Sequence, residues 1–216
     1  EKMAVPLRKS GLHRVNISLD TLNEKKFRDV TRTGELSEVI RGVEAAKNAG
    51  LGVKFNVVLM KDFNDDEIMD LIELTRIYDA DVRFIELMPI GENQGYAKAN
   101  FMACEEILKV AELRPVESDD PHAPTRYYRY GNAKGRVGFI TALSSHFCGD
   151  CNRIRLTSDG KLKPCLHSNQ EIDLRSAIRR SEDLGEIISS AIKSKPEKHY
   201  LSENRIIDRG MSRIGG

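Results

Sequence analysis

The chain has 216 residues, of which 31% are charged and 40% are hydrophobic, and its formal net charge at pH 7 is +1. This composition is typical of a globular protein with one large domain or two small ones. The near-zero charge argues against a general nucleic-acid binder or a polybasic membrane binder. No apolar run approaches the roughly 18 residues of a membrane span, and the sequence has no signal-peptide pattern. We therefore expect neither nucleic acid nor a membrane as a partner.

The first residues predict a helix followed by a strand. Residues 2–10 have the pattern of a helix end, which Gly11 stops. In 14–20 apolar and polar residues alternate, as they do in a strand. Thr21 and Glu24 have the spacing of a capping box, so a helical turn should open there.

Two more helix–strand pairs follow with short links. Residues 37–48 have one apolar face, and Gly50 stands where a C-terminal glycine cap belongs. Residues 53–60 then predict a strand. Asn64 and Glu67 should cap a helix whose apolar stripe is Ile68, Leu71, Ile72 and Ile77.

A third strand over 82–89 closes this part of the chain. Alternation of strands and helices predicts an α/β fold with a parallel sheet, either a piece of a barrel or an open doubly wound sheet.

Polar side chains recur along the predicted strands. Asn16, Ser18 and Asp20 share one face, and so do Lys54 and Asn56. A lysine inside a parallel strand is costly to bury unpaired, so Lys54 should face a polar cavity or a ligand, unless it ends its strand in solvent.

The third strand carries a second set of candidates. Glu86 and Met88 share a face, and Arg83 has the opposite parity. Met88 by itself is more typical of core packing than of a site.

Residues 90–100 predict a polar loop and a domain boundary, giving domains at 1–92 and 93–216. A helix over 102–113 should carry Cys104 as a small buried residue or, alternatively, as a fourth metal ligand. Residues 126–131 and 135–143 predict two antiparallel strands, so the second domain should be α+β.

The last part of the chain predicts two amphipathic helices within 172–194. In the tail, Arg209 and Arg213 precede a Gly-Gly end, which either frays or enters an anionic site.

Three of the four cysteines, Cys148, Cys151 and Cys165, are spaced C-x2-C-x13-C, which is a metal-ligand pattern. Strands over 152–157 and 161–165 around a turn at 157–160 would bring the third cysteine back to the first two. Such spacing suits a reducing compartment, and a disulfide is less favoured.

Spacing alone does not identify the metal. Three cysteines around a four-iron cluster leave one iron open to substrate, whereas His146 or His167 as a fourth ligand would close a structural zinc site.

Two arginines, Arg153 and Arg155, follow Cys151 directly. Strand alternation would place all three on one face, beside the metal. Paired guanidinium donors match phosphates or carboxylates. The alternative is that both arginines are solvated strand residues.

Several of these stretches together resemble one family. HFCGDCNRIRL, KLKPCL, RVNISLD, VKFNVVLMKDFNDDE, RFIELMP and the terminal IGG are similar to the radical S-adenosylmethionine enzymes that act as GTP 3′,8-cyclases in molybdenum cofactor biosynthesis. The resemblance runs from Gly11 to Gly216. It implies an incomplete (β/α)6 TIM-type barrel, followed by an α+β domain that carries an auxiliary [4Fe-4S] cluster.

The resemblance also implies site residues, which are assigned only to positions that match the family's motifs. Cys148, Cys151 and Cys165 would hold the auxiliary cluster, whose open iron binds the guanine of GTP. GTP would also contact Arg153, Arg155 and Lys54. It would contact Arg83 as well, although Arg83 has the opposite parity to Glu86 and Met88. S-adenosylmethionine would contact Ser18 and Met88, and Gly215 and Gly216 would enter the active site. No further catalytic side chain is assigned.

The implied reaction begins with S-adenosylmethionine. A 5′-deoxyadenosyl radical takes the ribose 3′ hydrogen of GTP, and closure onto guanine C8 gives 3′,8-cyclo-7,8-dihydro-GTP. A cyclic pyranopterin monophosphate synthase would use that product. The family also implies the bacterial or archaeal cytoplasm or the mitochondrial matrix, and a possible homodimer.

The sequence departs from the family in one respect. It has no C-x3-C-x2-C motif, which in the family binds the cluster that cleaves S-adenosylmethionine, and it starts at Glu1. We expect about half a barrel, with a second [4Fe-4S] cluster, to precede this chain, and we expect the chain alone not to generate the radical.

Three other interpretations stay open. One is a peptide-modifying radical S-adenosylmethionine enzyme, which would need neither the Arg-x-Arg nor the Gly-Gly end. A zinc-binding scaffold is the second, and a non-catalytic nucleotide-binding paralogue is the third.

Overall fold

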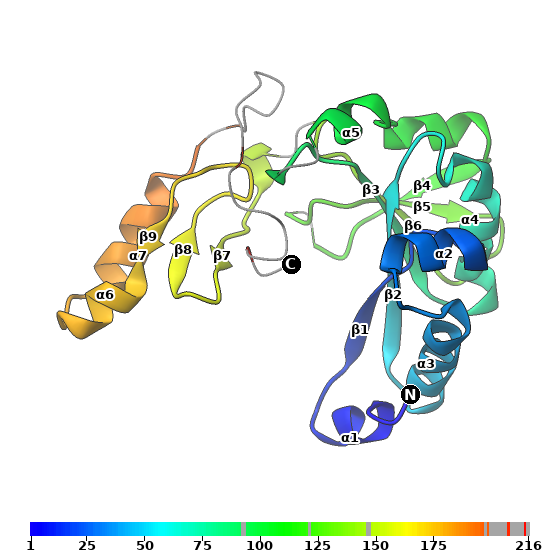
Figure 1. Cartoon of the computed structure of the whole chain (residues 1–216), viewed down its shortest axis with the longest axis horizontal. Coiled ribbons are helices and arrows are strands. Elements are labelled where there is room, and N and C mark those ends of the chain that lie inside the picture. Colours follow the sequence, from blue (N-terminus) through cyan, green and yellow to red (C-terminus); the bar gives the residue numbers. More distant parts are fainter. Residues whose placement is uncertain are drawn as a thin grey trace. The chain divides into compact units, whose positions relative to one another are not determined.

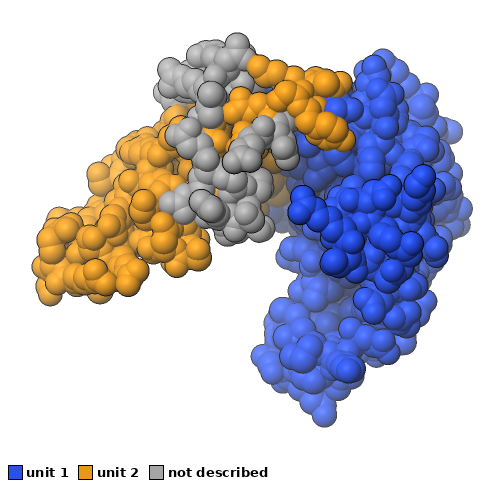
Figure 2. All heavy atoms as spheres, viewed as in Figure 1, with its two compact units in different colours: residues 1–87, 100–120, 125–144 blue, residues 88–99, 121–124, 145–216 orange. Residues whose placement is uncertain are grey.

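The structure, a computed structural model, describes residues 1–91, 94–120, 122–145, 148–196, 198, 207 and 214. The chain forms two compact units, coloured separately in Figure 2. Unit 1 comprises residues 1–87, 100–120 and 125–144, and unit 2 comprises residues 88–99, 121–124 and 145–216. The domain boundary that we predicted between residues 92 and 93 stays a prediction.

Unit 1 is a mixed sheet with helices (Figure 1). Its strands are β1 (Arg14–Ser18), β2 (Gly52–Leu59), β3 (Asp81–Glu86), β4 (Leu113–Val116), β5 (Arg126–Tyr130) and β6 (Val137–Ile140). Its α-helices are α1 (Ala4–Lys9), α2 (Glu24–Thr31), α3 (Leu36–Asn48) and α4 (Ile68–Ile77). Two short 3₁₀ helices complete it, η1 (Asp65–Glu67) and η3 (Cys104–Lys109).

The six strands have the order β1-β2-β3-β6-β5-β4. The pairs β1–β2, β2–β3 and β3–β6 are parallel, which confirms the α/β prediction, and β5 is antiparallel to both β4 and β6. The antiparallel pair predicted near 126–143 is therefore confirmed. It continues the parallel sheet, however, because β6 also pairs with β3.

One face of the sheet is apolar and packs on helices. Val53, Phe55 and Phe84 are among the buried strand residues in the main hydrophobic cluster. Val43 of α3 and Leu71 of α4 belong to the same cluster. Each large apolar side chain that is fully buried in this way contributes about 1.5–3 kcal/mol to folding.

The turn between β5 and β6 approaches the loop before β3 closely. A Cβ on Gly135 would lie 2.1 Å from the carbonyl oxygen of Ala80. Backbone cannot yield at that distance, so only glycine fits there.

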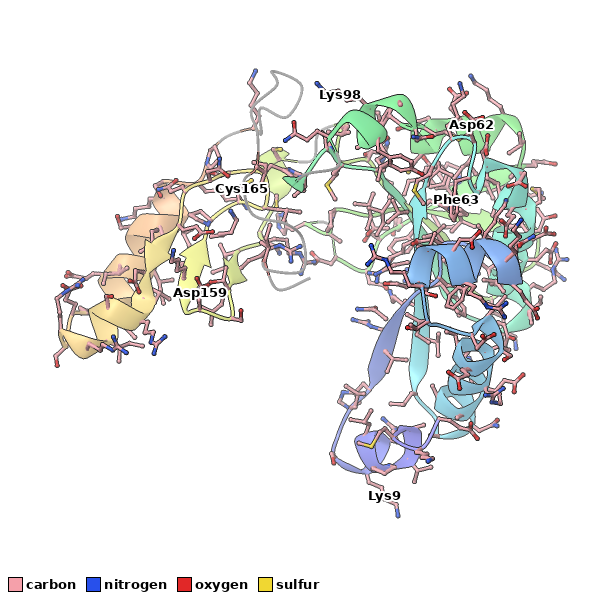
Figure 3. All side chains as sticks on the ribbon, in the orientation of Figure 1. Lys9, Asp62, Phe63, Lys98, Asp159 and Cys165 are labelled. Carbon is pink, nitrogen blue, oxygen red and sulfur yellow. The ribbon has the colours of Figure 1, made fainter. Side chains whose placement is uncertain are left out.

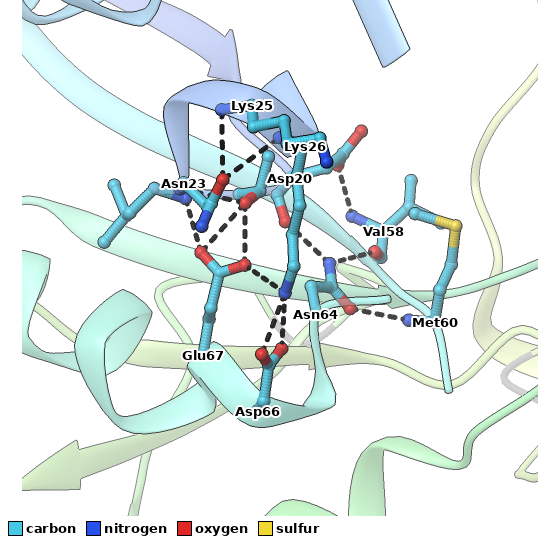
Figure 4. Close-up of polar contacts among 11 residues, drawn as sticks. Asp20, Asn23, Lys25, Lys26, Val58, Met60, Asn64, Asp66 and Glu67 are labelled. Atoms are coloured by element: carbon cyan, nitrogen blue, oxygen red, sulfur yellow. Dashed lines mark hydrogen bonds and ion pairs between the residues drawn. The ribbon is translucent and has the colours of Figure 1, made fainter. Parts of the chain in front are cut away.

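Both predicted capping boxes are wrong. Asn23 caps α2 through hydrogen bonds from the backbone N–H groups of Lys25 and Lys26. The Thr21 hydroxyl instead donates to Glu67, 2.7 Å away (Glu67 is labelled in Figure 4). Asn64 also makes no cap. Its side-chain amide donates to the backbone carbonyl oxygens of Asp20 and Val58. Its side-chain oxygen accepts from the backbone N–H of Met60. These polar side chains thus link the ends of β1 and β2.

The helix patterns are otherwise close to the structure. Gly11 and Gly50 have φ angles of +92° and +76°, as expected for residues that end a helix. Ile77, which we placed in the apolar stripe of α4, is 65% exposed, while Leu74 is buried. The predicted helix over 102–113 is only the six-residue η3, because β4 begins at Leu113.

Unit 2 is smaller and contains short elements. Its helices are α5 (Gln94–Ala99), η4 (Cys148–Asp150), α6 (Leu174–Arg179) and α7 (Leu184–Lys193), and its strands are β7 (Arg155–Leu156), β8 (Lys161–Lys163) and β9 (Ile172–Asp173). The sheet order β7-β8-β9 is antiparallel throughout. The two late helices are confirmed, whereas the loop predicted over 90–100 is wrong where α5 forms.

Among the described residues, no helix is both long enough and apolar enough to span a membrane.

Candidate functional site

The face of β1–β3 opposite the apolar core carries most of the strands' polar side chains. In register, Asn16 stands beside Lys54, and Lys54 beside Asp81. Ser18 and Arg83 lie in the next row, on either side of Asn56. Residues in register on neighbouring parallel strands point to the same face. Hence Ser18, Lys54 and Arg83 share one face, although Arg83 has the opposite parity to Glu86.

Lys54 is held on this face by an ion pair. Its Nζ lies 2.8 Å from Oδ2 of Asp81 and 3.2 Å from the Tyr127 hydroxyl. The two charged side chains are only 13% and 12% exposed, so Lys54 does not end its strand in solvent. The predicted polar cavity or ligand beside Lys54 stays a prediction.

Asp81 also binds Arg136, the residue before β6. Nη2 of Arg136 donates to Oδ2 at 3.0 Å, and both Nε and the backbone N–H of Arg136 donate to Oδ1. Burial would raise the pKa of Asp81, but hydrogen bonds from Arg136 and then Lys54 outweigh it and hold the pKa below its ordinary value. The carboxyl group is therefore an anion at neutral pH.

Two more contacts complete the charge distribution on this face. Arg83 donates from Nη2 to Oδ1 of Asn16 at 3.0 Å. Arg136 stacks over the Tyr127 ring at 4.0 Å and pairs with Asp119, whose side chain is 82% exposed. Three cations and two carboxylates, those of Asp81 and Asp119, thus lie on or beside this face, and the excess of positive charge suits an anionic ligand.

In unit 2 a short hairpin lies between the first two predicted metal ligands and the third. Arg155 pairs with Lys163, and Gly160, with a φ angle of +83°, lies in the turn between the strands. Burial is the largest cause of a raised pKa at Cys165, and the thiols of Cys148 and Cys151 raise that pKa further. All three cysteines are half-buried (Cys165 is labelled in Figure 3).

Within the described ranges, no group of three His, Cys, Asp or Glu side chains is close enough to hold a metal ion. The three-cysteine metal site therefore stays a prediction. His167, one of the two candidate zinc ligands, has Nε2 3.0 Å from the sulfur of Met88. His146, the other, lies outside the described residues.

The segment after Cys151 differs from the prediction. Residues 151–154 are outside any strand, and β7 begins only at Arg155, so strand alternation does not place Cys151, Arg153 and Arg155. Lys195, which follows α7, holds this segment instead. Its Nζ donates to the carbonyl oxygen of Cys151 and, at 3.0 Å, to that of Arg153. Sequence analysis missed Lys195, because its partners lie more than 40 residues away and no local pattern marks it.

Glu86 is a second residue whose partners the sequence did not reveal. It is fully buried and accepts hydrogen bonds from the backbone N–H groups of Leu143 at 2.7 Å and Ser144 at 2.9 Å. The N–H of Cys104 donates to its other oxygen at 3.3 Å. A glutamate within an apolar strand was the available signal, since a buried carboxylate must find donors.

Cys104 is fully buried in the core of unit 1, which confirms the prediction of a small buried residue. Its thiol donates to the carbonyl oxygen of Phe84 at 3.5 Å. Arg209, Arg213, Gly215 and Gly216 lie outside the described residues, so their predicted roles stay predictions.

Two family models together match most of the chain. The Radical SAM superfamily model matches residues 1–75, and the Molybdenum Cofactor Synthesis C model matches residues 80–201. The junction between them falls just before β3.

Curated relatives cover the whole chain. It is 52% identical over its full length to the GTP 3′,8-cyclase of Alkaliphilus oremlandii and 51% identical to that of Alkaliphilus metalliredigens. It covers 68% and 69% of those two proteins. The corresponding enzyme of Peptoclostridium acidaminophilum is 47% identical over 97% of the chain, which covers 66% of that protein. With this identity across both family models, the chain belongs to the GTP 3′,8-cyclase family.

Proposed function

We propose that this protein converts GTP to 3′,8-cyclo-7,8-dihydro-GTP, the first step of molybdenum cofactor biosynthesis. The observation that carries the proposal is the 52% identity over the whole chain to a GTP 3′,8-cyclase. The product would pass to a cyclic pyranopterin monophosphate synthase. We further propose that the protein works in the cytoplasm or, in a eukaryote, the mitochondrial matrix, with a homodimer as a possible assembly.

Cys148, Cys151 and Cys165 would hold the auxiliary [4Fe-4S] cluster of the C-terminal domain. Their spacing in the sequence and their partial burial support this assignment. When bound, the cluster supplies an iron without a protein ligand, which can bind the guanine of GTP. The cysteines fix where the base lies, and Lys195 orders the backbone that carries Cys151.

Arg153, Arg155, Lys54 and Arg83 would bind GTP. Guanidinium groups offer paired donors that match phosphate oxygens, and lysine adds a mobile point charge. Together these residues would neutralise the triphosphate and fix the ribose in one orientation. Orientation is the protein's main contribution to such chemistry, because the cofactor performs the difficult bond-breaking step.

Ser18 and Met88 would contact S-adenosylmethionine, and an expected second [4Fe-4S] cluster belongs to the same reaction. Bound together, these groups supply the radical that removes the ribose 3′ hydrogen. The contact of Met88 with His167 would position the thioether for that role. Gly215 and Gly216 would enter the active site, where residues without side chains fit. An incomplete barrel would enclose the reactants and exclude water.

The test is a metal analysis of anaerobically purified protein, followed by EPR of the reduced protein with and without GTP. We expect iron and sulfide at about four each per three-cysteine site, and a spectrum that GTP changes. One zinc and no iron would make the cysteine segment structural and refute the cluster assignment. Iron with a spectrum that GTP leaves unchanged would refute the guanine site alone.

A further inference from the structure

Asp81, on the polar face of unit 1, makes more contacts with one of its two cationic partners than with the other. Asp81 receives three hydrogen bonds from Arg136, counting its backbone N–H, and these involve both carboxylate oxygens. Lys54 makes one ion pair, at 2.8 Å to Oδ2. Arg136 is thus the firmly held cation, and Lys54 is the one that can leave at lower cost.

The departure of Lys54 would not leave Asp81 unpaired. Removing the sole partner of a buried charge is strongly unfavourable. Here Arg136 would still satisfy both oxygens, and its side chain is only 16% exposed, so water does not compete strongly for it. Lys54 also contacts neutral groups of Tyr127, namely its hydroxyl at 3.2 Å and its ring, whose centroid is 5.4 Å away.

Lys54 also lies near a second cation on the same face, which we likewise take to bind GTP. It stands one row from Arg83, which shares that face through the register of β2 and β3. The lysine side chain has a flexible stem of four carbons, so its ammonium group can move between neighbouring acceptors without a change in the backbone.

We propose that Asp81 is a positioning residue that holds Lys54 in the absence of substrate and competes with the triphosphate of GTP for the lysine ammonium group. The inference rests on the proposed function, since it takes Lys54 as a GTP-binding residue. Asp81 would keep Lys54 ordered on the polar face, at the cost of weaker binding of the phosphates. Guanosine, which has no phosphate, would not be affected.

The experiment measures GTP and guanosine affinities by calorimetry for the wild-type protein and for Asp81→Asn. Asparagine keeps the shape and can still accept a hydrogen bond, but it no longer competes as an anion. We expect Asp81→Asn to bind GTP roughly three- to tenfold more tightly, as for the loss of one close competing charge. Guanosine affinity should stay unchanged.

Two further variants separate release of Lys54 from a general charge effect. In a Lys54→Met background, Asp81→Asn should no longer tighten GTP binding. Asp119→Asn is the matched control, because it removes the same charge from Arg136 while the Asp119 side chain is 82% exposed. It should change GTP affinity less than twofold, which is the scale of an exposed pair.

The outcomes are distinguishable. Unchanged or weaker GTP binding by Asp81→Asn, or tightening that persists without Lys54, overturns the competition. Equal tightening by Asp119→Asn also overturns it. If the wild-type protein binds GTP and guanosine with equal affinity, Lys54 does not bind the phosphates, and both proposals fail.

If circular dichroism shows that Asp81→Asn is unfolded, Tyr127→Phe replaces it. That variant loses the other contact of Lys54 and should tighten GTP binding by a smaller factor, and unchanged binding would count against the proposal.

Discussion

At the scale of single residues, charged side chains in this protein are held by partners that fix their ionisation. Asp81 is the clearest example, because two cations keep its carboxyl group ionised despite burial. The Arg153 side chain is exposed, and Lys195 donates to the carbonyl oxygen of this residue. Asp81 therefore contributes to both folding and the polar face.

Arg153→Ala should weaken GTP binding by about tenfold or more, as for the loss of one charge-assisted pair. Iron content should stay near the wild-type value, because Lys195 contacts the backbone carbonyl and not the guanidinium group. Calorimetry and iron analysis of the same preparation check both. Arg179→Ala, at the end of α6, is the control. Unchanged GTP affinity would refute the role of Arg153.

Asp81 should also make stability depend on pH. Its folded-state pKa is lower than the ordinary value of 3.8, so the unfolded chain binds the proton more readily. The contribution of Asp81 is fully present above that value and is lost as the pH falls through the lower, folded-state pKa. We expect the free energy of unfolding of unit 1 to fall less steeply below pH 4 in Asp81→Asn than in wild-type protein. Parallel slopes in urea titrations would contradict this expectation.

At the scale of elements, two long-range side chains hold the segments around the cysteines. Lys195 binds the carbonyls of the Cys151 segment, and Glu86, at the end of β3, binds the N–H groups that follow β6. Both connect a charged group to backbone, which is costly to leave unpaired. Loops held in this way keep their shape without regular secondary structure.

Lys195→Met should loosen the segment from Cys151 to Arg153. The methionine keeps the length of the stem and removes all the donors, so the two carbonyls lose their partner. We expect iron to be lost to a chelator several times faster than from wild-type protein. The Lys193→Met variant, at the exposed end of α7, should behave as wild type. Equal rates of iron loss in all three proteins would show that Lys195 does not order the site.

Glu86→Gln should destabilise unit 1. A glutamine has one acceptor oxygen, and its amide would face backbone donors, so at least one buried N–H loses its partner. The expected cost is about 2–4 kcal/mol, measured as a loss in the free energy of unfolding. Glu105→Gln removes a more exposed carboxylate, and its cost should be below about 1 kcal/mol. Similar costs for both variants would contradict the importance of the buried contacts.

At the scale of the whole molecule, the predicted ligands of the auxiliary cluster all lie in unit 2, whereas Lys54 and Arg83 lie in unit 1. Unit 1 has a large apolar cluster of its own. Unit 2 has short strands and few large buried side chains among its described residues. A bound cluster would therefore contribute proportionally more to the stability of unit 2.

Removing iron with a chelator should affect the two units differently. Hydrogen exchange should accelerate in β7 and β8, next to the cysteines, and stay unchanged in β2 and β3. Mass spectrometry of peptic fragments distinguishes these segments. Equal acceleration in both units would mean that the cluster stabilises the whole protein.

The sequence by itself determined the parallel βαβ segment, the two late helices and the hairpin that precedes Cys165. These follow from patterns within one element or between neighbours, namely alternation, helical periodicity and glycine at a turn. It also determined the family, through motifs that are specific in their order and spacing.

Only the tertiary structure decided which polar groups meet. Thr21 and Glu24 had the correct spacing for a cap, yet Thr21 binds Glu67, because the end of β1 lies beside the end of β2. Arg83 has the opposite parity to Glu86, and it is the register of β2 and β3 that places it on the face of Lys54. Pairings such as Asp81 with Arg136 join residues far apart in the chain. Local patterns carry no information about such pairs, because their energy arises only when the strands have been brought together.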